Sequence, residues 1–294
     1  MPAPLYRRVL VVANPVAGRG RGAATAMRLR DQLAERGADV ELFLTSARGS
    51  GAERLRRLER GTDLVVAVGG DGTVAEVLSE LPTTVPLAVL PMGTANVLSL
   101  DLGLPRSAEG LLRTLGSGRA TEIDVAQVNG RVSFLVTGVG FDGEIVRDVE
   151  RRRAGPIRKW TYVRAGLVGL ARYSAPELWV ELDGRRLERP YGWVLVSNMI
   201  GYGGVIELWR GRRLDDGLYE VFLFDARSRW QLVAHAVRGL LRRLPGRSCR
   251  MEQARHVRIE SAVPVPYEVD GDFGGETPVE IEVLAGRHRL LLPW

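Results

Sequence analysis

The stretch Gly69-Gly70-Asp71-Gly72-Thr73 decides how the first part of this 294-residue chain is interpreted. Residues 63–68 before it (DLVVAV) form a nearly continuous apolar run, which is typical of a buried parallel strand. Residues 74–81 after it have helical spacing. Glycines let the main chain approach a phosphate closely, and a helix N-terminus offers unpaired N–H groups and partial positive charge. The five residues therefore predict a phosphate-binding turn, without saying whose phosphate it binds.

The surrounding sequence alternates strands and helices up to about residue 120. Alternating strand–helix units imply a parallel sheet with helices on both faces. The predicted strands are 9–13, 40–45, 64–68 and 86–90, and the predicted helices are 23–36, 52–60, 74–81 and 108–115.

Two further polar turns follow strands of this predicted sheet. Asn14-Pro15-Val16-Ala17-Gly18-Arg19-Gly20 follows the first strand, and Pro91-Met92-Gly93-Thr94-Ala95-Asn96 follows the fourth. In an open parallel sheet, ligands bind beyond the carboxyl ends of the strands. Three such turns at one edge favour a ligand site over ordinary tight turns. Thr45, at the end of the second strand, faces the same edge and could add a hydroxyl contact.

The pattern changes near residue 121 to a series of short strands. A hairpin is predicted from 123–128 and 132–136 around Asn129-Gly130, and such runs of strands favour a sandwich or barrel. We therefore expect an α/β nucleotide-binding domain at 1–122 and a β-rich acceptor domain at 123–294. The further predicted strands are 178–182, 193–197, 218–224, 257–260, 266–270, 279–284 and 287–292, and helices are predicted at 159–173 and 228–243.

Charge and cysteine content narrow the class of protein. The net charge of +6 favours anionic partners, although all but one of the 41 basic residues are arginine, which also indicates a compositional bias. The single Cys249 excludes an intramolecular disulfide and favours a reducing compartment. The three histidines lack zinc-type spacing. No signal peptide is visible, and no apolar run reaches the roughly 18 to 20 residues that span a bilayer.

The motifs resemble one family as a set. The matching residues of the first half are Asn14-Pro15 with Gly18, Gly69 to Thr73 with Glu76 and Val77, and Pro91 with Gly93-Thr94 and Asn96. Those of the second half are Gly140-Phe141-Asp142, Tyr202-Gly203-Gly204, Leu214-Asp215-Asp216-Gly217-Leu218 and Asp270-Gly271-Asp272. In this order they resemble the diacylglycerol kinase catalytic-domain superfamily, which includes bacterial lipid kinases and sphingosine and ceramide kinases. The glycine–aspartate turn alone also occurs in NAD kinases and phosphofructokinases.

The resemblance implies an N-terminal α/β domain of the NAD kinase/phosphofructokinase type, a C-terminal β-rich sandwich domain, and an active site in the cleft between them. It implies ATP as the phosphate donor. Because like charges repel, we expect Asp71 to act through Mg²⁺ and water or to hold the turn by accepting N–H groups. Glu76 is expected to cap its own helix or to organise the phosphate turn. The implied ATP contacts are Asn14, Thr45, Gly69, Gly70, Asp71, Gly72, Thr73, Thr94 and Asn96.

The acidic residues of the second half supply the other expected roles. The resemblance points to Asp216 for a structural Mg²⁺ site, which needs hard oxygen ligands. Asp270-Gly271-Asp272 resembles an Asp-Gly-Glu block whose last acid is a proton acceptor, so Asp272 is the expected base and Asp270 the second candidate. Asp272 is one methylene shorter than that glutamate. Asp142 is a further candidate for orienting the acceptor hydroxyl.

Basic segments indicate where the chain would meet a lipid substrate. The segment 151–160 contains two arginine clusters and Trp160, and 159–173 is suited to an interfacial helix. Arg238, Arg242 and Arg243 form a second basic helix. We expect a cytoplasmic protein that is peripherally associated with the membrane and acts in lipid metabolism. The basic residues lack the interleaved aromatics of a nucleic-acid platform, so no nucleic-acid partner is expected, and a homodimer is left open.

Three functions are consistent with these features. The leading one is an ATP-dependent kinase of a lipid hydroxyl, with diacylglycerol or a related lipid as acceptor. The second is a kinase of a soluble hydroxyl, as in NAD kinase. The third is a non-catalytic nucleotide- or lipid-binding regulator, which is suggested by Asp272 and by Ala75, where many relatives have Asn.

Overall fold

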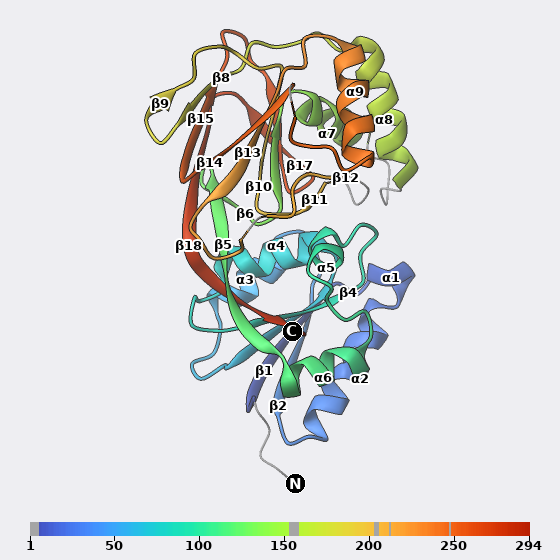
Figure 1. Cartoon of the computed structure of the whole chain (residues 1–294). Helices are drawn as coiled ribbons and strands as arrows, with labels where there is room; N and C mark the ends of the chain where they lie inside the picture. Colours follow the sequence, from blue (N-terminus) through green and yellow to red (C-terminus); the bar gives the residue numbers. More distant parts are fainter. Residues whose placement is uncertain (1–5, 153–158, 203–205, 212, 247) are drawn as a thin grey trace. The chain divides into compact units, whose positions relative to one another are not determined.

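The protein is described by a computed structural model that covers residues 6–152, 159–202, 206–211, 213–246 and 248–294, without the side chains of residues 159–163. Its contacts divide the chain into two units (Figure 1). The first unit contains Met1–Ile123 and Gly286–Trp294, and the second contains Asp124–Ala285. The expected domains placed all of 123–294 in the second unit, whereas the contacts of the last nine residues lie with the first.

The first unit alternates strands and helices along the chain. Its strands are β1 (Arg8–Ala13), β2 (Asp39–Leu44), β3 (Leu64–Gly69) and β4 (Leu87–Pro91), and its helices are α1 (Ala17–Gly20), α2 (Gly22–Ala34), α3 (Ser50–Arg56), α4 (Asp71–Glu80), α5 (Val97–Asp101) and α6 (Ala108–Ser117). The strands pair in parallel in the order β2-β1-β3-β4, which confirms the predicted parallel sheet. The short helix α5 was not predicted.

Both faces of this sheet are covered by helices. On one face Val9, Val11 and Ala13 pack with leucines of α2 and α6. On the other, α4 packs against β1 and β3 and beside α3, and Val12 faces Gly51 of α3. Because β3 and β4 are covered on both faces, every one of their residues is buried. This burial explains why both strands are continuous apolar runs in the sequence.

Two strands continue from one unit into the other, β5 (Arg119–Val128) and β18 (Val279–Leu292). The sequence pattern predicted two strands at 279–284 and 287–292, but the structure has one 14-residue strand. Gly286, with φ of 56°, lets the strand pass this point without ending. The end of β18 pairs in parallel with β4 through Leu290 and Leu87, so it extends the first unit's sheet.

The second unit is built mainly from antiparallel strands. These are β6 (Arg131–Ser133), β7 (Val136–Val139), β8 (Trp179–Leu182), β9 (Arg185–Arg186), β10 (Trp193–Ser197), β11 (Gly201–Tyr202), β12 (Ile206–Glu207), β13 (Tyr219–Phe224), β14 (Cys249–Ala254), β15 (His256–Glu260), β16 (Pro266–Val269) and β17 (Asp272–Glu276). One six-stranded sheet has the order β14-β13-β10-β7-β16-β17, and a second group runs β18-β15-β8-β9, with β5 paired to β18 and β6.

The core of the second unit lies between these two sheets. Valines and leucines of β7, β10 and β13 pack against those of β8, β15 and β18, which makes a sandwich. The other face of the six-stranded sheet is covered by α7 (Phe141–Arg151), α8 (Lys159–Arg172) and α9 (Arg229–Leu240), through aromatic residues of β10 and β13 (Figure 1). The predicted β-rich sandwich is confirmed.

Helix α7 and strands β14 and β17 were not predicted from the sequence. In α7, Phe141, Ile145 and Val149 recur at i, i+4 and i+8 among charged residues, with Val146 beside them, so the sequence carries a helical pattern that was missed. In β14 just two of six residues are buried. The pattern of β14 therefore gives little periodic signal. Among the helices that the structure describes, none combines the length and the apolar character needed to cross a membrane.

Candidate functional site

The three glycine-containing turns of the first unit are joined to one another by main-chain hydrogen bonds. The Asn14 N–H donates to the Val68 carbonyl at 3.0 Å, and the Gly18 N–H donates to the Met92 carbonyl at 2.7 Å. The Met92 N–H donates in turn to the Gly69 carbonyl at 2.7 Å. The turns that follow β1, β3 and β4 therefore form one continuous edge, as the parallel topology requires.

Two glycines of this edge are in direct main-chain contact. A Cβ added to Gly93 would lie 2.5 Å from the Cα of Gly70, and a Cβ added to Gly69 would lie 2.2 Å from Oγ1 of Thr73. Thr73 itself is buried. A side chain on Gly70 or Gly93 would force the two turns apart, and one on Gly69 would clash with Thr73 of its own turn. By contrast, Gly72 is exposed, and a Cβ there would meet nothing within 4 Å.

Asp71 holds the turn after β4. Its Oδ2 accepts the Val97 N–H at 3.0 Å and its Oδ1 accepts the Leu98 N–H at 3.4 Å, so it binds the N-terminus of α5. Burial raises the pKa of Asp71, and the N–H groups that it accepts oppose this shift. Of the two roles expected for Asp71, holding the turn is the one that the structure displays.

Two asparagine side chains close their own turns. Asn96, in the left-handed region with φ of 50°, accepts the Gly93 N–H at 2.8 Å and donates to the Gly93 carbonyl at 2.9 Å. Asn14 accepts the Val16 N–H at 3.1 Å. Both amides therefore act on the conformation of the loops. Asparagine suits both positions because its short side chain bonds to nearby main chain, and at Asn96 it also tolerates the left-handed region.

Glu76 caps a different helix from the one expected. Its Oε1 accepts the Gly49 N–H at 2.8 Å and its Oε2 accepts the Gly51 N–H at 3.0 Å. Both donors belong to the start of α3, whose cap residue Gly49 has φ of 86°. The sequence pattern suggested a cap of its own helix, but the side chain instead links α4 to α3.

The groups of this edge that are not used to hold the loops are main-chain groups and hydroxyls. The carboxylates and amides are used to hold the loops, while Gly72 and Thr94 are exposed and Thr45 is half-buried at the end of β2. The ten-residue helix α4 begins at Asp71, close to the end of β3, and the first N–H groups of a helix have no carbonyl partner one turn earlier within it. Such N–H groups, with the helix dipole, bind an anion without a side chain.

In the second unit, Asp270 is fully engaged by its surroundings. Its Oδ1 accepts the Ser133 hydroxyl at 2.8 Å and the Leu135 and Val136 N–H groups at 3.0 and 3.1 Å. Its Oδ2 accepts the Phe134 N–H at 3.0 Å. Burial raises the pKa of Asp270 to about 6, and these donors oppose the shift. Asp270 therefore holds the loop between β6 and β7.

Asp272 lies in a more open setting. Its Oδ2 forms an ion pair with Arg131 at 2.8 Å, and its side chain is 39% exposed. A partly exposed carboxylate can reach a substrate, whereas Asp270 has both oxygens occupied. Arg131 was missed by the sequence analysis, because one arginine among so many carries no distinguishing signal.

A buried pair of acids lies beneath these residues. Glu268, which is 3% exposed, accepts the Gly271 N–H on Oε2 at 2.6 Å and so supports the turn between Asp270 and Asp272. Asp142, equally buried, accepts the Trp193 indole N–H at 2.8 Å and the Tyr202 hydroxyl.

The surroundings of these two acids favour their neutral forms. Burial raises the pKa of Asp142 to about 6. Burial and the charge of Asp142 raise the pKa of Glu268 well above its ordinary value. Because Asp142 is covered and already accepts two donors, its expected contact with an acceptor hydroxyl stays a prediction. Glu268 was missed, although a single acid inside the apolar run 265–269 is a usable signal.

Comparison with known proteins covers both units. Residues 8–128 match the family described as diacylglycerol kinase catalytic domain. Residues 135–292, more than half of the chain, match the YegS C-terminal NAD kinase beta sandwich-like domain. The chain belongs to the diacylglycerol kinase-like family.

The relatives cover nearly the full length of the chain. The diacylglycerol kinase of Bacillus subtilis is 25% identical over 98% of this chain and 97% of its own, and that of Staphylococcus aureus is 24% identical over 93% and 89%. A protein from Synechocystis without an assigned function is 25% identical over 96% of this chain and 70% of its own. Named relatives of this kind support membership in a lipid kinase family.

Solved structures show the same fold. A crystal structure of a diacylglycerol kinase from Bacillus anthracis has a TM-score of 0.72 at 22% identity, covering 98% of this chain and 97% of its own. A second structure from that organism reaches 0.78 at 23% identity with the same coverage. An NAD kinase from Archaeoglobus fulgidus in complex with ATP has a TM-score of 0.52 at 15% identity, covering 98% and 93%. The predicted likeness to the NAD kinase fold is confirmed.

The family resemblance implies that Asp216 binds Mg²⁺. The groups around Asp216 show whether the described side chains could form such a site. Asp216 accepts the Leu218 N–H on Oδ1 at 3.1 Å, and Gly217 donates to the buried Asp124 at 2.7 Å. Among the described residues, no group of three or more acidic, histidine or cysteine side chains could hold a metal ion. Side chains alone do not build a magnesium site at Asp216, so this assignment stays a prediction.

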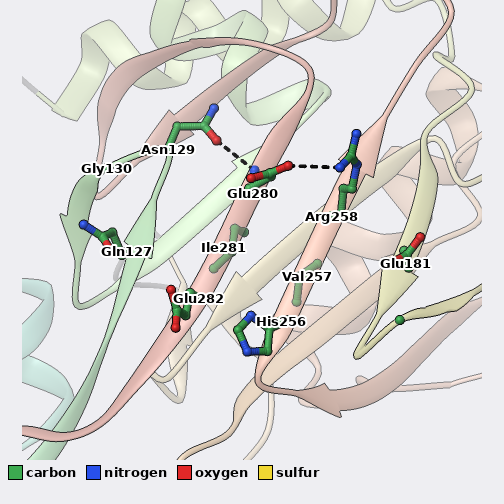
Figure 2. A pocket seen from close by; sticks show the side chains of 11 residues that line it. Gln127, Asn129, Gly130, Glu181, His256, Val257, Arg258, Glu280, Ile281 and Glu282 are labelled. Carbon is green, nitrogen blue, oxygen red and sulfur yellow. Dashed lines mark hydrogen bonds and ion pairs between the residues drawn. The ribbon is translucent and has the colours of Figure 1, made fainter.

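Described residues of the second unit line two larger hollows. One, of about 560 Å³, is lined by Phe273 and Gly275 of β17, by Glu276, and by Arg147, Glu150 and Arg151 of α7. It begins one residue beyond Asp272. The other, of about 350 Å³, lies over β5, β15 and β18, where Arg258 and Asn129 flank Glu280 (Figure 2). None of the predicted site residues lines that second hollow.

Some predicted features lie outside the described residues. These are Arg153 and Arg158, the side chains of Lys159 and Trp160, and the Gly203-Gly204 part of one family block. The membrane role expected for the segment 151–160 therefore stays a prediction.

Proposed function

We propose that this protein is an ATP-dependent lipid kinase that transfers the γ-phosphate to a hydroxyl of diacylglycerol or a related lipid. The observation that carries the proposal is the edge formed by the three turns of the first unit. There, acids and amides hold the loops, and the exposed Gly72 leaves the start of α4 open to an anion. The ATP complex of a protein with this fold supports ATP as the donor.

The proposed reaction joins the lipid hydroxyl oxygen to the γ-phosphorus and breaks the bond between that phosphorus and the oxygen bridging to ADP. The hydroxyl proton passes to a carboxylate. Asp272 is the proposed acceptor, since its side chain is 39% exposed and Asp270 already accepts four donors. Phosphoryl transfer from ATP also uses Mg²⁺ bound to the nucleotide phosphates. The hollow beside β17 offers space for an acceptor next to Asp272.

The proposal is tested by incubating the purified chain with γ-labelled ATP, Mg²⁺ and detergent micelles that contain one lipid at a time. The panel contains diacylglycerol, a sphingoid base, ceramide and a long-chain isoprenoid alcohol, with NAD as the soluble acceptor. We expect label in a lipid and none in NAD. Label in NAD alone would establish a soluble-hydroxyl kinase. Tight ATP binding without transfer to any acceptor would establish a regulator that retains the fold.

A further inference from the structure

Helix α9 presents an apolar face that no described part of the chain covers. Trp230 is 70% exposed, Val237 47% and Leu240 59%, and Leu241 at the C-cap is 57% exposed. Trp230, Ala234, Val237 and Leu241 are spaced at i, i+4, i+7 and i+11, which places them on one side of the helix. Large exposed apolar groups gathered in this way mark an interaction surface.

The opposite side of α9 is fixed to the second unit. Leu232, His235 and Gly239 are its buried residues. The ring of His235 lies 5.0 Å from that of Phe224, and a Cβ added to Gly239 would meet Ile206 at 2.4 Å. A capping box formed by Ser228 and Gln231 fixes the start of the helix. The apolar face is therefore presented by a rigid, anchored helix.

The charge around this face is mainly positive, although Glu207 pairs with Arg242 and Asp225 pairs with Arg227. Residues 226–250 contain no Asp or Glu, and Arg227, Arg229, Arg238, Arg242 and Arg243 lie on the helix or beside its ends. Within the part of the chain that the structure describes, no acidic side chain pairs with Arg229 or Arg243. Arg229 lies over the ring of Trp230, with its guanidinium carbon 5.5 Å from the ring centroid.

Charge complementarity determines the kind of partner. An apolar stripe that contains a tryptophan and is bordered by an excess of arginines matches an anionic bilayer surface, where apolar groups enter the interface and arginines reach the lipid phosphates. We propose that α9 docks the protein on an anionic lipid bilayer, with Trp230, Val237, Leu240 and Leu241 in the interface. This inference rests on the proposed function, since a kinase of membrane lipids must reach its acceptor there.

The helix next to α9 is compatible with docking of α9 on a bilayer. Helix α8 packs beside α9 and exposes Leu167, which is 64% accessible (Figure 1). The helix pair is too short and too polar to span a bilayer, and a helix lying flat in the interface needs only one apolar side. The helix that the sequence marks as basic therefore also has an exposed apolar side, and the burial of its residues in the structure is what shows this.

The test measures binding of the full chain to vesicles by sedimentation, independently of any enzyme activity. Vesicles of pure phosphatidylcholine are compared with vesicles that also contain phosphatidylglycerol. We expect binding to the anionic vesicles that weakens at high salt. The triple variant Trp230→Gln, Val237→Gln, Leu240→Gln should bind at least about tenfold more weakly, because the apolar contribution is lost. The variant Arg229→Gln with Arg243→Gln should lose affinity, and its remaining binding should depend less on salt.

A matched control replaces an exposed apolar residue elsewhere in the same unit. Val263 is 60% exposed, and Val263→Gln should bind vesicles as the unaltered chain does. Equal vesicle binding by the triple variant, or no binding by the unaltered chain, would overturn the proposal. A dimer in light scattering that the triple variant converts to a monomer would also overturn it, since a second copy would then cover the face.

Activity assays separate this inference from the proposed function. The triple variant should phosphorylate a short-chain diacylglycerol dispersed as monomers at the normal rate, and lose turnover on the same lipid class in vesicles. An unaltered chain that binds vesicles but phosphorylates no lipid would disprove the proposed function while leaving the docking surface intact.

Discussion

The carboxylates of this protein have two kinds of role, which differ in the groups that their oxygens bind. Asp71, Glu76 and Asp270 accept main-chain N–H groups and hold loops. Asp272 forms a partly exposed ion pair with Arg131. The sequence places all four in suggestive motifs, but residue type alone does not distinguish an acid that organises a loop from one that meets a substrate.

The roles of Asp272 and Asp270 can be separated by matched substitutions. Asp272→Asn should lower turnover by about 10²- to 10⁴-fold with little change in ATP affinity, because a general base contributes about that much. Asp270→Asn should instead lower the free energy of unfolding by about 1 to 3 kcal/mol, because buried donors lose their acceptor. Turnover on the preferred lipid and urea unfolding measure the two effects. Unchanged turnover in Asp272→Asn would eliminate this residue as the base.

His288 makes the stability of the first unit depend on pH. It is buried at 2% exposure, and burial and the charge of Arg287 lower its pKa to about 4, against a hydrogen bond with the main chain of Leu78. The unfolded chain, with a histidine pKa near 6.5, therefore takes up this proton first as pH falls. The stability supplied by neutral His288 is fully present above pH 6.5 and is lost as pH falls toward about 4, by roughly 3 kcal/mol.

The pH dependence due to His288 is measured as the difference in unfolding free energy between the unaltered chain and a variant. Asp142 and Asp270, with pKa values of about 6, titrate in the same range with the opposite sign. Urea unfolding of the unaltered chain and of His288→Gln should therefore be compared at each pH from 4 to 7. The advantage of the unaltered chain should shrink by roughly 3 kcal/mol across this range. The exposed His256→Gln serves as control, and a constant difference for His288→Gln would refute the prediction.

At the scale of elements, helix ends and turns are joined by side chains that are distant in sequence. Glu76 of α4 caps α3, and Asp71 of the same helix binds the start of α5. The helices and strands themselves follow from apolar periodicity, which is why most of them were predicted. The links between them were not predictable, because a cap residue 25 positions away leaves no local pattern.

Glu76→Ala provides a test of this linkage. Loss of both acceptor oxygens should lower the free energy of unfolding by about 1 to 2 kcal/mol, as for other lost caps. Amide hydrogen exchange should rise in residues 49–56 more than in α4 itself. Glu80→Ala, which removes an exposed ion pair with Arg56, is the control and should cost at most about 1 kcal/mol. Equal exchange in α3 for the two variants would show that Glu76 is not the cap.

At the scale of the whole molecule, the chain returns to its first unit at the end. Residues 286–294 belong to that unit, and Leu290, Leu291 and Leu292 are each at most 3% exposed. The sequence pattern places these residues in the second domain, because an apolar strand at the end of a run of strands looks like one more member of the same sheet. Its partner, β4, is 200 residues earlier, which no local pattern records.

Removal of residues 286–294 should therefore unfold the first unit. Each buried leucine is worth about 2 to 5 kcal/mol, so three together rival the whole stability of a typical domain. Hydrogen exchange should show loss of protection in β1, β3 and β4. Removal of Pro293 and Trp294 alone is the control, since Trp294 is 66% exposed. Retained protection in the longer truncation would contradict this assignment.

The parallel α/β sheet, the β-rich second part and the three glycine turns could be predicted from local patterns, because buried strands, helices and tight turns each require apolar residues and glycine at characteristic positions. The roles of the polar residues became visible in the folded structure alone. It placed Arg131 beside Asp272, Glu268 under Gly271 and Glu76 on α3, and left one apolar side of α9 exposed. The physical reason is that hydrogen bonds, ion pairs and burial depend on residues far apart in sequence, whose proximity exists only once the chain has folded.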